Sequence, residues 1–131
     1  MSGAEPVWIE EQDVLALHGK LLAYHGGAVG VRDRGLLQSA LARARNLAAY
    51  GERADLVDMA TAYTAGIVKS HPFVDGNKRT GFVVGVLFLE LNGRAFRATE
   101  TAAADAVVAL AAGSLDEAGY AAFLRANVAP Q

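Results

Sequence analysis

Cysteine is absent from the 131 residues of this chain. Its absence excludes disulfide bridges, thiolate zinc sites and a cysteine nucleophile, and it fits the reducing cytoplasm, where we expect the protein to act. A long apolar run is also missing, because the stretch from Phe82 to Leu91 is shorter than the ~20 residues that span a bilayer and contains Glu90. The segment from Met1 to Pro6 has neither a basic region nor an apolar one, so we expect no signal peptide.

No excess of charge of one sign is present either, since 12 Lys and Arg residues face 14 Asp and Glu residues, for a formal net charge of −2. This balance gives no electrostatic reason to expect direct binding to nucleic acid or to an acidic membrane. Apolar residues, by contrast, make up 53% of the chain, with alanine and leucine dominant. This composition and the length favour one compact helical domain over residues 1–131.

The spacing of apolar residues predicts helices over residues 10–24, 34–50 and 54–70, with Asp33 as the cap of the second. The glycine-rich segment 26–33 between the first two is predicted to be a loop or small flap. A fourth helix is expected over residues 77–91. Its middle, residues 82–89, is apolar on every side, which predicts the central buried helix, although the same run is β-branched enough for a buried strand.

The remaining chain is expected to form a turn at residues 92–94, a short extended piece through Ala98, and two further helices. These helices are predicted over residues 100–112 and 115–127, with Ser114 capping the last one in a capping box with Glu117. The predicted fold class is therefore all-α, a bundle of about six helices with a small flap after the first.

Most residues that could carry chemistry lie in the segment His71–Thr80, with the sequence HPFVDGNKRT. The first N–H groups of a helix lack intrahelical partners and form the positive end of its dipole, so a helix that begins near residue 77 offers a phosphate site. Gly76 would let a ligand approach the backbone closely. Two cations in the first turn, Lys78 and Arg79, are electrostatically unfavourable at a helix N-terminus unless an anion binds between them. The alternative is that both side chains face water.

Two residues of this segment allow two interpretations each. Asp75 either caps the helix or binds Mg²⁺ together with phosphate oxygens. His71 is either a core histidine or a general base that takes the proton of an attacking hydroxyl, while Phe73 anchors the loop in the core. His18 and His25 could share a helix face, but a third metal ligand is not identifiable, so we expect no metal site there.

The segment HPFVDGNKRT resembles the signature of the Fic/Doc family, in which His, Pro, Phe, an acid, Gly, Asn and Arg recur in this order. The block from Gly26 to Leu41 resembles the upstream block of the death-on-curing (Doc) branch, and Asn92-Gly93 falls where that branch has it. The resemblance covers residues 10 to 100 and leaves residues 100–131 as C-terminal helices. It implies an all-α bundle with the motif in a loop between two central helices.

The resemblance also implies roles for the residues of the motif. His71 would be the general base, Asp75 would bind the Mg²⁺ of ATP·Mg²⁺, and residues 26–33 would form a flap that aligns a target protein. Lys78 and Arg79 would join His71 as catalytic residues by stabilising the charge of the transferred group. The implied nucleotide contacts are Gly76, through its backbone, Asn77, Lys78 and Arg79.

Two positions bear on the reaction. AMP-transferring members usually have Gly in place of Lys78 and a second Arg in place of Phe82, whereas Doc proteins resemble this chain at Lys78. Similarity to Doc implies a kinase toxin that transfers phosphate from ATP to a threonine of translation elongation factor Tu and blocks translation. Pro72 and Gly76 are shared with AMP-transferring members, so AMPylation of a protein hydroxyl is one alternative, and a non-catalytic nucleotide- or partner-binding module is another.

Many Fic proteins are held inactive by a helix bearing Ser or Thr, three spacers, Glu and then Gly or Asn. The chain lacks this sequence, so an inhibitor would have to be another chain. Similarity to Doc implies a small, partly disordered antitoxin that folds onto an apolar helical surface of the toxin.

Overall fold

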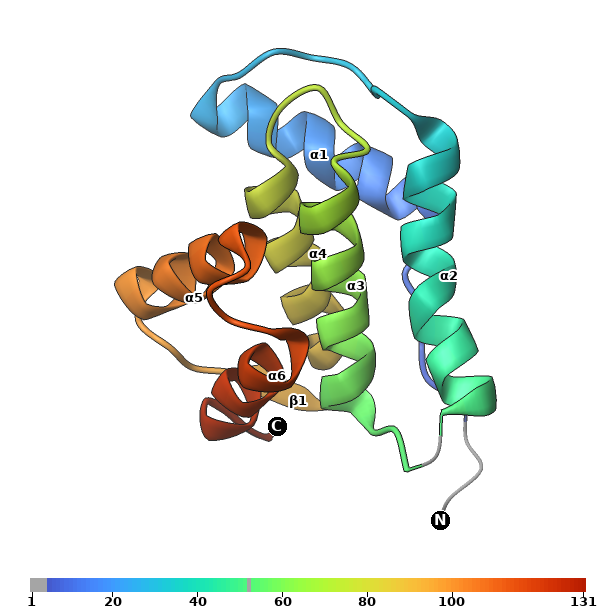
Figure 1. The fold of residues 1–131 in the computed structure, drawn as a ribbon, viewed down its shortest axis with the longest axis vertical. Helices are drawn as coiled ribbons and strands as arrows, with labels where there is room; N and C mark the ends of the chain where they lie inside the picture. Colours follow the sequence, from blue (N-terminus) through green and yellow to red (C-terminus); the bar gives the residue numbers. More distant parts are fainter. Residues whose placement is uncertain (1–4, 52) are drawn as a thin grey trace.

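The computed structural model describes residues 5–51 and 53–131, which form six α-helices and one small β-sheet (Figure 1). The predicted all-α fold class is therefore confirmed. Within residues 5–51 and 53–131, the helices include no candidate for a membrane span. The elements are α1 (Glu11–His25), α2 (Arg34–Tyr50), α3 (Leu56–Ser70), α4 (Asn77–Leu91), β1 (Arg94–Phe96), α5 (Glu100–Ala112), α6 (Glu117–Ala126) and β2 (Val128–Pro130).

Local capping residues explain most helix boundaries. The Asp33 carboxylate accepts a hydrogen bond from the N–H of Leu36 and starts α2, as predicted. Asp55 caps α3 and Thr99 caps α5 in the same way, and Gly113 ends α5 in the left-handed conformation that glycine favours. The alternative of a strand over residues 82–89 is wrong, because these residues continue α4.

The predicted start of the last helix is also wrong. α6 is capped by Asp116, whose Oδ1 accepts from the N–H of Gly119 at 2.7 Å. Ser114 lies before this helix, and its hydroxyl donates to the carbonyl of Ala109 at 3.3 Å. Because Ser114 belongs to the end of α5, Glu117 is the first residue of α6 and forms no capping box with it.

β2 was not predicted at all. It pairs antiparallel with β1, with Ala95 opposite Ala129, and so returns the end of the chain to the turn after α4. Strands of three residues are too short to show an alternating pattern, and their pairing depends on how α5 and α6 fold back.

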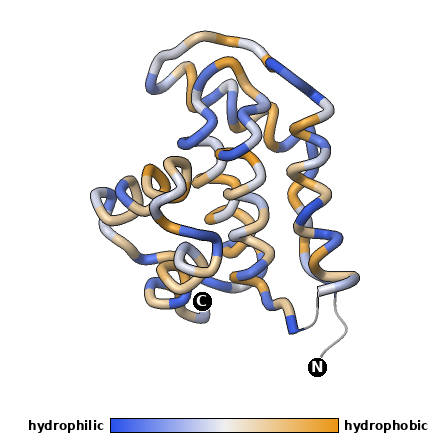
Figure 2. The backbone as a smooth tube through the Cα atoms, in the orientation of Figure 1, coloured by the Kyte–Doolittle hydropathy of each residue, from blue (hydrophilic) through white to orange (hydrophobic). Residues whose placement is uncertain are grey.

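The most buried helix is α3, not α4 as the sequence analysis predicted. α3 lies between α2 and α4, and each of its residues from Met59 to Val68 is buried (Figure 1). α4 buries one face, which includes Val84 and Phe88, but leaves Val83 and Val86 only half-buried. Figure 2 shows hydrophobic residues along both helices, while hydrophobic and hydrophilic residues alternate along α2. The second apolar face of α4 lines a cleft instead of the core.

Glycines allow α3 and α4 to approach each other closely. The hydroxyl of Thr64 on α3 donates to the carbonyl of Gly81 on α4 at 2.7 Å. A Cβ atom at Gly81 would lie 2.8 Å from Cγ1 of Val68, and one at Gly85 would overlap the Thr64 hydroxyl. The two helix backbones are therefore closer than ordinary side chains permit.

We expect Gly85→Ala to lower the free energy of unfolding by about 1–3 kcal/mol, the usual cost of overpacking a well-filled core. Gly19→Ala is the matched control, because a Cβ atom there meets nothing within 4 Å on the exposed face of α1. A helical Gly-to-Ala change without a clash should stabilise the protein by about 0.5–1 kcal/mol. Denaturant unfolding of both variants measures the difference, and equal effects would contradict this packing.

Candidate active site

The motif loop, which we define as residues 71–76, joins α3 to α4 and ends where the N-terminus of α4 begins. The flap, residues 26–33, joins α1 to α2 at the same end of the bundle (Figure 1). Residues separated by 38 or more positions in the chain therefore meet here, and the contacts between loop and flap decide how the motif is presented.

His71 is exposed at the C-terminus of α3, so the alternative of a core histidine is excluded. Its backbone is left-handed, with φ of 54°, while its N–H still donates to the carbonyl of Ile67 at 3.2 Å. This conformation is uncommon for a residue other than glycine and persists only where the surroundings hold it. Pro72 follows and prevents the helix from continuing.

Arg32 of the flap holds the end of α3. Its Nε donates to the carbonyl of His71 and its Nη2 to the carbonyl of Ser70, both at 2.7 Å. A cation is favourable there, because the last carbonyls of a helix lack partners and carry the negative end of its dipole. This role of Arg32 is not evident from the sequence, because its partners lie 39 and 38 residues away along the chain.

Backbone hydrogen bonds also join the flap to the motif loop. The carbonyl of Pro72 accepts from the N–H groups of Arg32 and Asp33, at 2.7 and 3.0 Å. The N–H of Val74 donates to the carbonyl of Gly30 at 3.1 Å. The flap therefore lies along the motif loop as a short antiparallel pair. One edge of the flap takes part in this pair, and its other edge makes no backbone hydrogen bond to the motif loop.

Asn77 closes the motif loop from inside. Its Oδ1 accepts from the N–H of Phe73, its Nδ2 donates to the carbonyl of the same residue, both at 2.9 Å, and only 6% of Asn77 is exposed. Its Nδ2 also lies 3.4 Å from Nδ1 of His71, a long contact. Phe73 is buried, as predicted for an anchor. Because the side-chain amide of Asn77 is already hydrogen-bonded within the protein, the group that Asn77 offers to a phosphate is its backbone N–H.

The N-terminus of α4 is open. Gly76 is its N-cap, with φ of 81°, and no side chain caps the first turn, so Asp75 does not serve as the cap. Lys78 and Arg79 are exposed in this turn, and no carboxylate within residues 5–51 and 53–131 forms an ion pair with either. Open N–H groups and two unpaired cations form a site for an anion.

Asp75 links the motif loop to the flap. Its Oδ2 accepts from the N–H of Ala28 at 3.1 Å and its Oδ1 from the N–H of Gly76 at 2.8 Å. These two hydrogen bonds lower the pKa of the Asp75 carboxyl below its ordinary value of 3.8, and the charge of Arg79 adds to the effect.

The exposed Asp75 carboxylate fits a magnesium ion, since each oxygen keeps a lone pair and Mg²⁺ takes one or two carboxylates with phosphate oxygens and water. Among the described residues, no three His, Asp or Glu side chains gather as a metal cluster. His18 is buried and stacks on the ring of Phe73, and the ring of His25 makes an edge-to-face contact with the ring of Tyr24.

The contact of Asp75 with the flap should depend on pH only in the acid range in which the Asp75 carboxyl becomes protonated. A carboxyl group whose pKa is lowered by folding contributes stability that is complete above its unfolded value, here 3.8, and that is lost as the pH falls through the lower folded value. The Ala28 amide in ¹H–¹⁵N NMR spectra should therefore titrate with a midpoint below 3.8. Asp75→Asn should abolish this titration; a midpoint at or above 3.8 in the unaltered protein would contradict the hydrogen bond.

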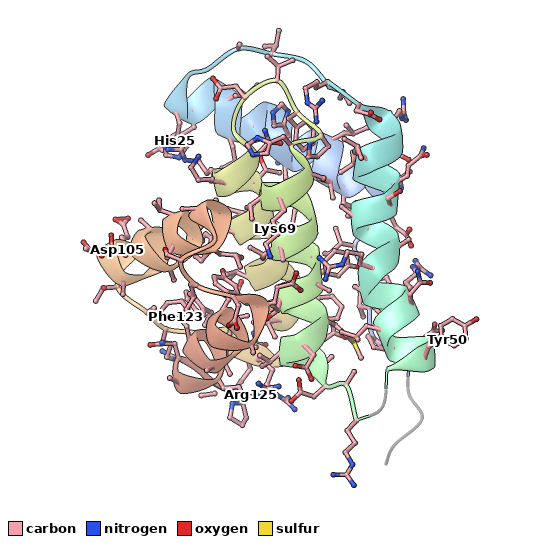
Figure 3. All side chains as sticks on the ribbon, in the orientation of Figure 1. His25, Tyr50, Lys69, Asp105, Phe123 and Arg125 are labelled. Atoms are coloured by element: carbon pink, nitrogen blue, oxygen red, sulfur yellow. The ribbon has the colours of Figure 1, made fainter. Side chains whose placement is uncertain are left out.

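A cleft of about 850 Å³ is lined by all the catalytic, nucleotide-contact and magnesium-binding residues predicted from the sequence. This volume is typical of small-molecule sites. One end is polar and contains His71, Asp75, Gly76, Asn77, Lys78 and Arg79. The other end is apolar and lies between α4 and α5; it contains Phe82, Val83, Val86, Ala104, Val107 and Val108. His25 at the end of α1 also lines the cleft, and Figure 3 places it on the same side of the molecule as Asp105 of α5.

Comparison with known proteins gives a match to the Fic/DOC family over residues 8–89, a stretch that contains the flap and the motif loop. The chain is similar to the protein kinase doc of Escherichia phage P1, with 32% identity over 118 residues, which are 89% of this chain and 92% of that protein. It is also similar to the toxin Doc of Mycolicibacterium smegmatis, with 39% identity over 88 residues, which are 66% of this chain and 65% of that protein. The motif, its position between α3 and α4 and these matches agree: the chain belongs to the Fic/DOC family, in its death-on-curing branch.

Proposed function

We propose that this chain is a Doc-like toxin that transfers the terminal phosphate of ATP to a Ser or Thr hydroxyl of a protein. The observation that carries the proposal is that an exposed histidine, an ionised carboxylate and an open helix N-terminus with two unpaired cations line one cleft. The relatives named as a protein kinase and a toxin support it.

The phosphates of ATP would bind at the first turn of α4. Backbone N–H groups after Gly76 would donate to phosphate oxygens, with the helix dipole adding to the attraction. Arg79 can donate two parallel hydrogen bonds to a phosphate, whereas Lys78 acts as a point charge. A magnesium ion held by Asp75 would neutralise part of the charge on the phosphate oxygens.

His71 would act as the general base. The target hydroxyl would lose its proton to the imidazole, and its oxygen would form a bond to the terminal phosphorus of ATP. The bond from that phosphorus to the bridging oxygen would break, and ADP would leave with the electron pair. Arg79, Lys78 and the N-terminus of α4 would stabilise the charge that spreads over the transferred group.

The flap would align the target segment beside His71. Its backbone pairs with the motif loop through Gly30 and Arg32, while the side chain of Val29 at its tip is exposed. An extended target segment could add to its free edge by main-chain hydrogen bonds. We propose translation elongation factor Tu as the target, so that the outcome of transfer in the cytoplasm is a block of translation.

An antitoxin would have to be supplied by another chain. The apolar end of the cleft offers it a surface, since Val83 and Val86 of α4 are half-buried and Val108 of α5 is 54% exposed. A helical segment with apolar side chains would cover this surface and obstruct the adjacent nucleotide site.

Phosphate transfer is preferred to AMP transfer because α4 carries a single arginine in the cleft. Where a second arginine would hold the nucleotide, Phe82 instead contacts the ring of Phe96, with ring centroids 5.7 Å apart. Replacing a bidentate cation by an apolar ring removes one phosphate clamp, which favours a different nucleotide orientation.

Two labels distinguish the reactions. Purified protein would be incubated with cell lysate or with purified elongation factor Tu, using ATP labelled at the γ-phosphate or at the α-phosphate, with His71→Ala as the control. A His71-dependent band labelled only from the γ-phosphate supports the kinase. A band labelled from the α-phosphate would establish AMP transfer instead. Absence of both labels, with binding of ATP retained, would favour a non-catalytic binding module.

A further inference from the structure

His18 is a buried polar residue that the mechanism above does not use. It lies on α1, is only 5% exposed, and stacks on the ring of Phe73 with centroids 3.7 Å apart and planes 10° apart. Its Nε2 lies 2.8 Å from the carbonyl oxygen of Asp75, 57 residues further along the chain. A carbonyl oxygen only accepts, so Nε2 carries the proton and donates.

This hydrogen bond fixes one end of a particular peptide unit. The carbonyl of Asp75 belongs to the same peptide as the N–H of Gly76, and that N–H donates to the Asp75 carboxylate at 2.8 Å. A trans peptide is planar, with its carbonyl and N–H pointing in opposite directions. His18 and the Asp75 carboxylate therefore hold the peptide from both ends.

The orientation of this peptide decides what the N-terminus of α4 presents to an anion. Gly76 has φ of 81° and can adopt either hand, so the peptide before it is free to flip unless something holds it. With its carbonyl turned toward α1, the negative end of the peptide dipole points away from the phosphate site. A flip would place a carbonyl oxygen beside the phosphate oxygens and repel them.

We infer that His18 is a positioning residue for the phosphate site: its Nε2–H holds the Asp75 carbonyl so that the first turn of α4 presents N–H groups to the nucleotide. Stacking on Phe73 sets the plane of the imidazole, and burial keeps water from replacing it as the donor. The inference rests on the proposed function for the identity of the bound nucleotide. The orientation of the peptide between Asp75 and Gly76 does not depend on that function.

Two variants distinguish the effect of the N–H donor of His18 from the effect of its stacked ring. His18→Phe keeps a flat ring against Phe73 and lacks the donor, whereas His18→Gln supplies an N–H₂ group at about the position of Nε2 without the ring. The Gly76 and Asn77 amides of the ligand-free proteins would be followed by ¹H–¹⁵N NMR. We expect His18→Phe to shift and broaden these two amides, because the peptide samples two orientations, and His18→Gln to restore them. A purely structural role of the ring predicts the reverse order.

ATP·Mg²⁺ affinity, measured by calorimetry, is the second readout. We expect His18→Phe to weaken binding at least ~10-fold and His18→Gln to remain within ~3-fold of the unaltered protein, since one preorganising hydrogen bond is lost and regained. Suppose that neither the unaltered protein nor the two variants bind ATP, but that the Gly76 and Asn77 amides still differ between the variants. The proposed function then fails and the positioning role stands. Unchanged Gly76 and Asn77 amides in folded His18→Phe would overturn it.

A measurement on the unaltered protein makes the test independent of variant folding. In ¹⁵N-histidine-labelled protein, the Nε2–H of His18 should be visible and protected from exchange with water, as expected for a buried donor to a carbonyl. Protonation at Nδ1 with a bare Nε2 would overturn the inference, because a bare nitrogen cannot donate to the Asp75 carbonyl.

Discussion

His71→Ala is expected to lower the rate of phosphate transfer by at least ~10²-fold, the usual contribution of a positioned general base. The loss should appear in kcat, because the imidazole acts on the attacking hydroxyl and not on the bound nucleotide. Its effect on stability should be small, since His71 is exposed. Single-turnover transfer of the γ-phosphate to the target measures the change directly.

Two controls make this result specific to the base. His71→Asn tolerates the left-handed backbone at this position and preserves the end of α3, yet provides no base, so it should be as inactive as alanine. His25→Ala removes another exposed histidine of the same cleft and should leave the rate within about threefold of normal, as for residues outside the chemistry. Full activity of purified His71→Ala or His71→Asn would end the proposed mechanism.

Arg79→Ala should be the second severe change, with kcat/KM lowered by ~10²–10³-fold, because Arg79 would contact charge that develops on the transferred phosphate. Arg79→Lys keeps the charge but loses the bidentate geometry, so we expect an intermediate rate. Steady-state transfer kinetics separate a rise in KM, which reports nucleotide binding, from a fall in kcat, which reports stabilisation of the transition state.

The matched control for this prediction is Arg94→Ala. Arg94 is exposed on β1 and lies outside the cleft, so its removal changes the net charge equally without touching the site. Equal rates for Arg79→Ala and Arg94→Ala would show that Arg79 contributes only to the general field of the protein. A large effect of Arg79→Ala on kcat alone would place its contact in the transition state.

Local signals were sufficient for the existence of the helices and for the motif, although not for the start of α6. Helix formation depends on residues three and four positions apart, and capping on residues two or three positions apart, so the helical spacing and Asp33 identified their elements correctly. The ten residues from His71 to Thr80 also lie together in one loop and one helical turn. The common cleft of His71 and residues 74–79 could therefore be expected before any tertiary contact was known.

The prediction that α4 is the central buried helix was wrong for a different reason. An apolar surface reports that something covers it, but it does not say whether the cover is the core, a ligand or a partner chain. The run from Phe82 to Leu89 predicted a fully buried α4, yet its second face lines the cleft, while α3 with its less conspicuous sequence is enclosed by α2 and α4.

Only the packing of distant segments decided how the motif is held. Arg32 on the end of α3, His18 beneath the Asp75 carbonyl and the Ala28 N–H on the Asp75 carboxylate each join residues 38 or more positions apart. Such hydrogen bonds are short-range and directional, so their existence depends on where the flap and α1 come to lie. The chemical groups of the site thus lie in one local segment of the chain. The orientation of this segment comes from two others, the flap and α1, which the fold brings against it.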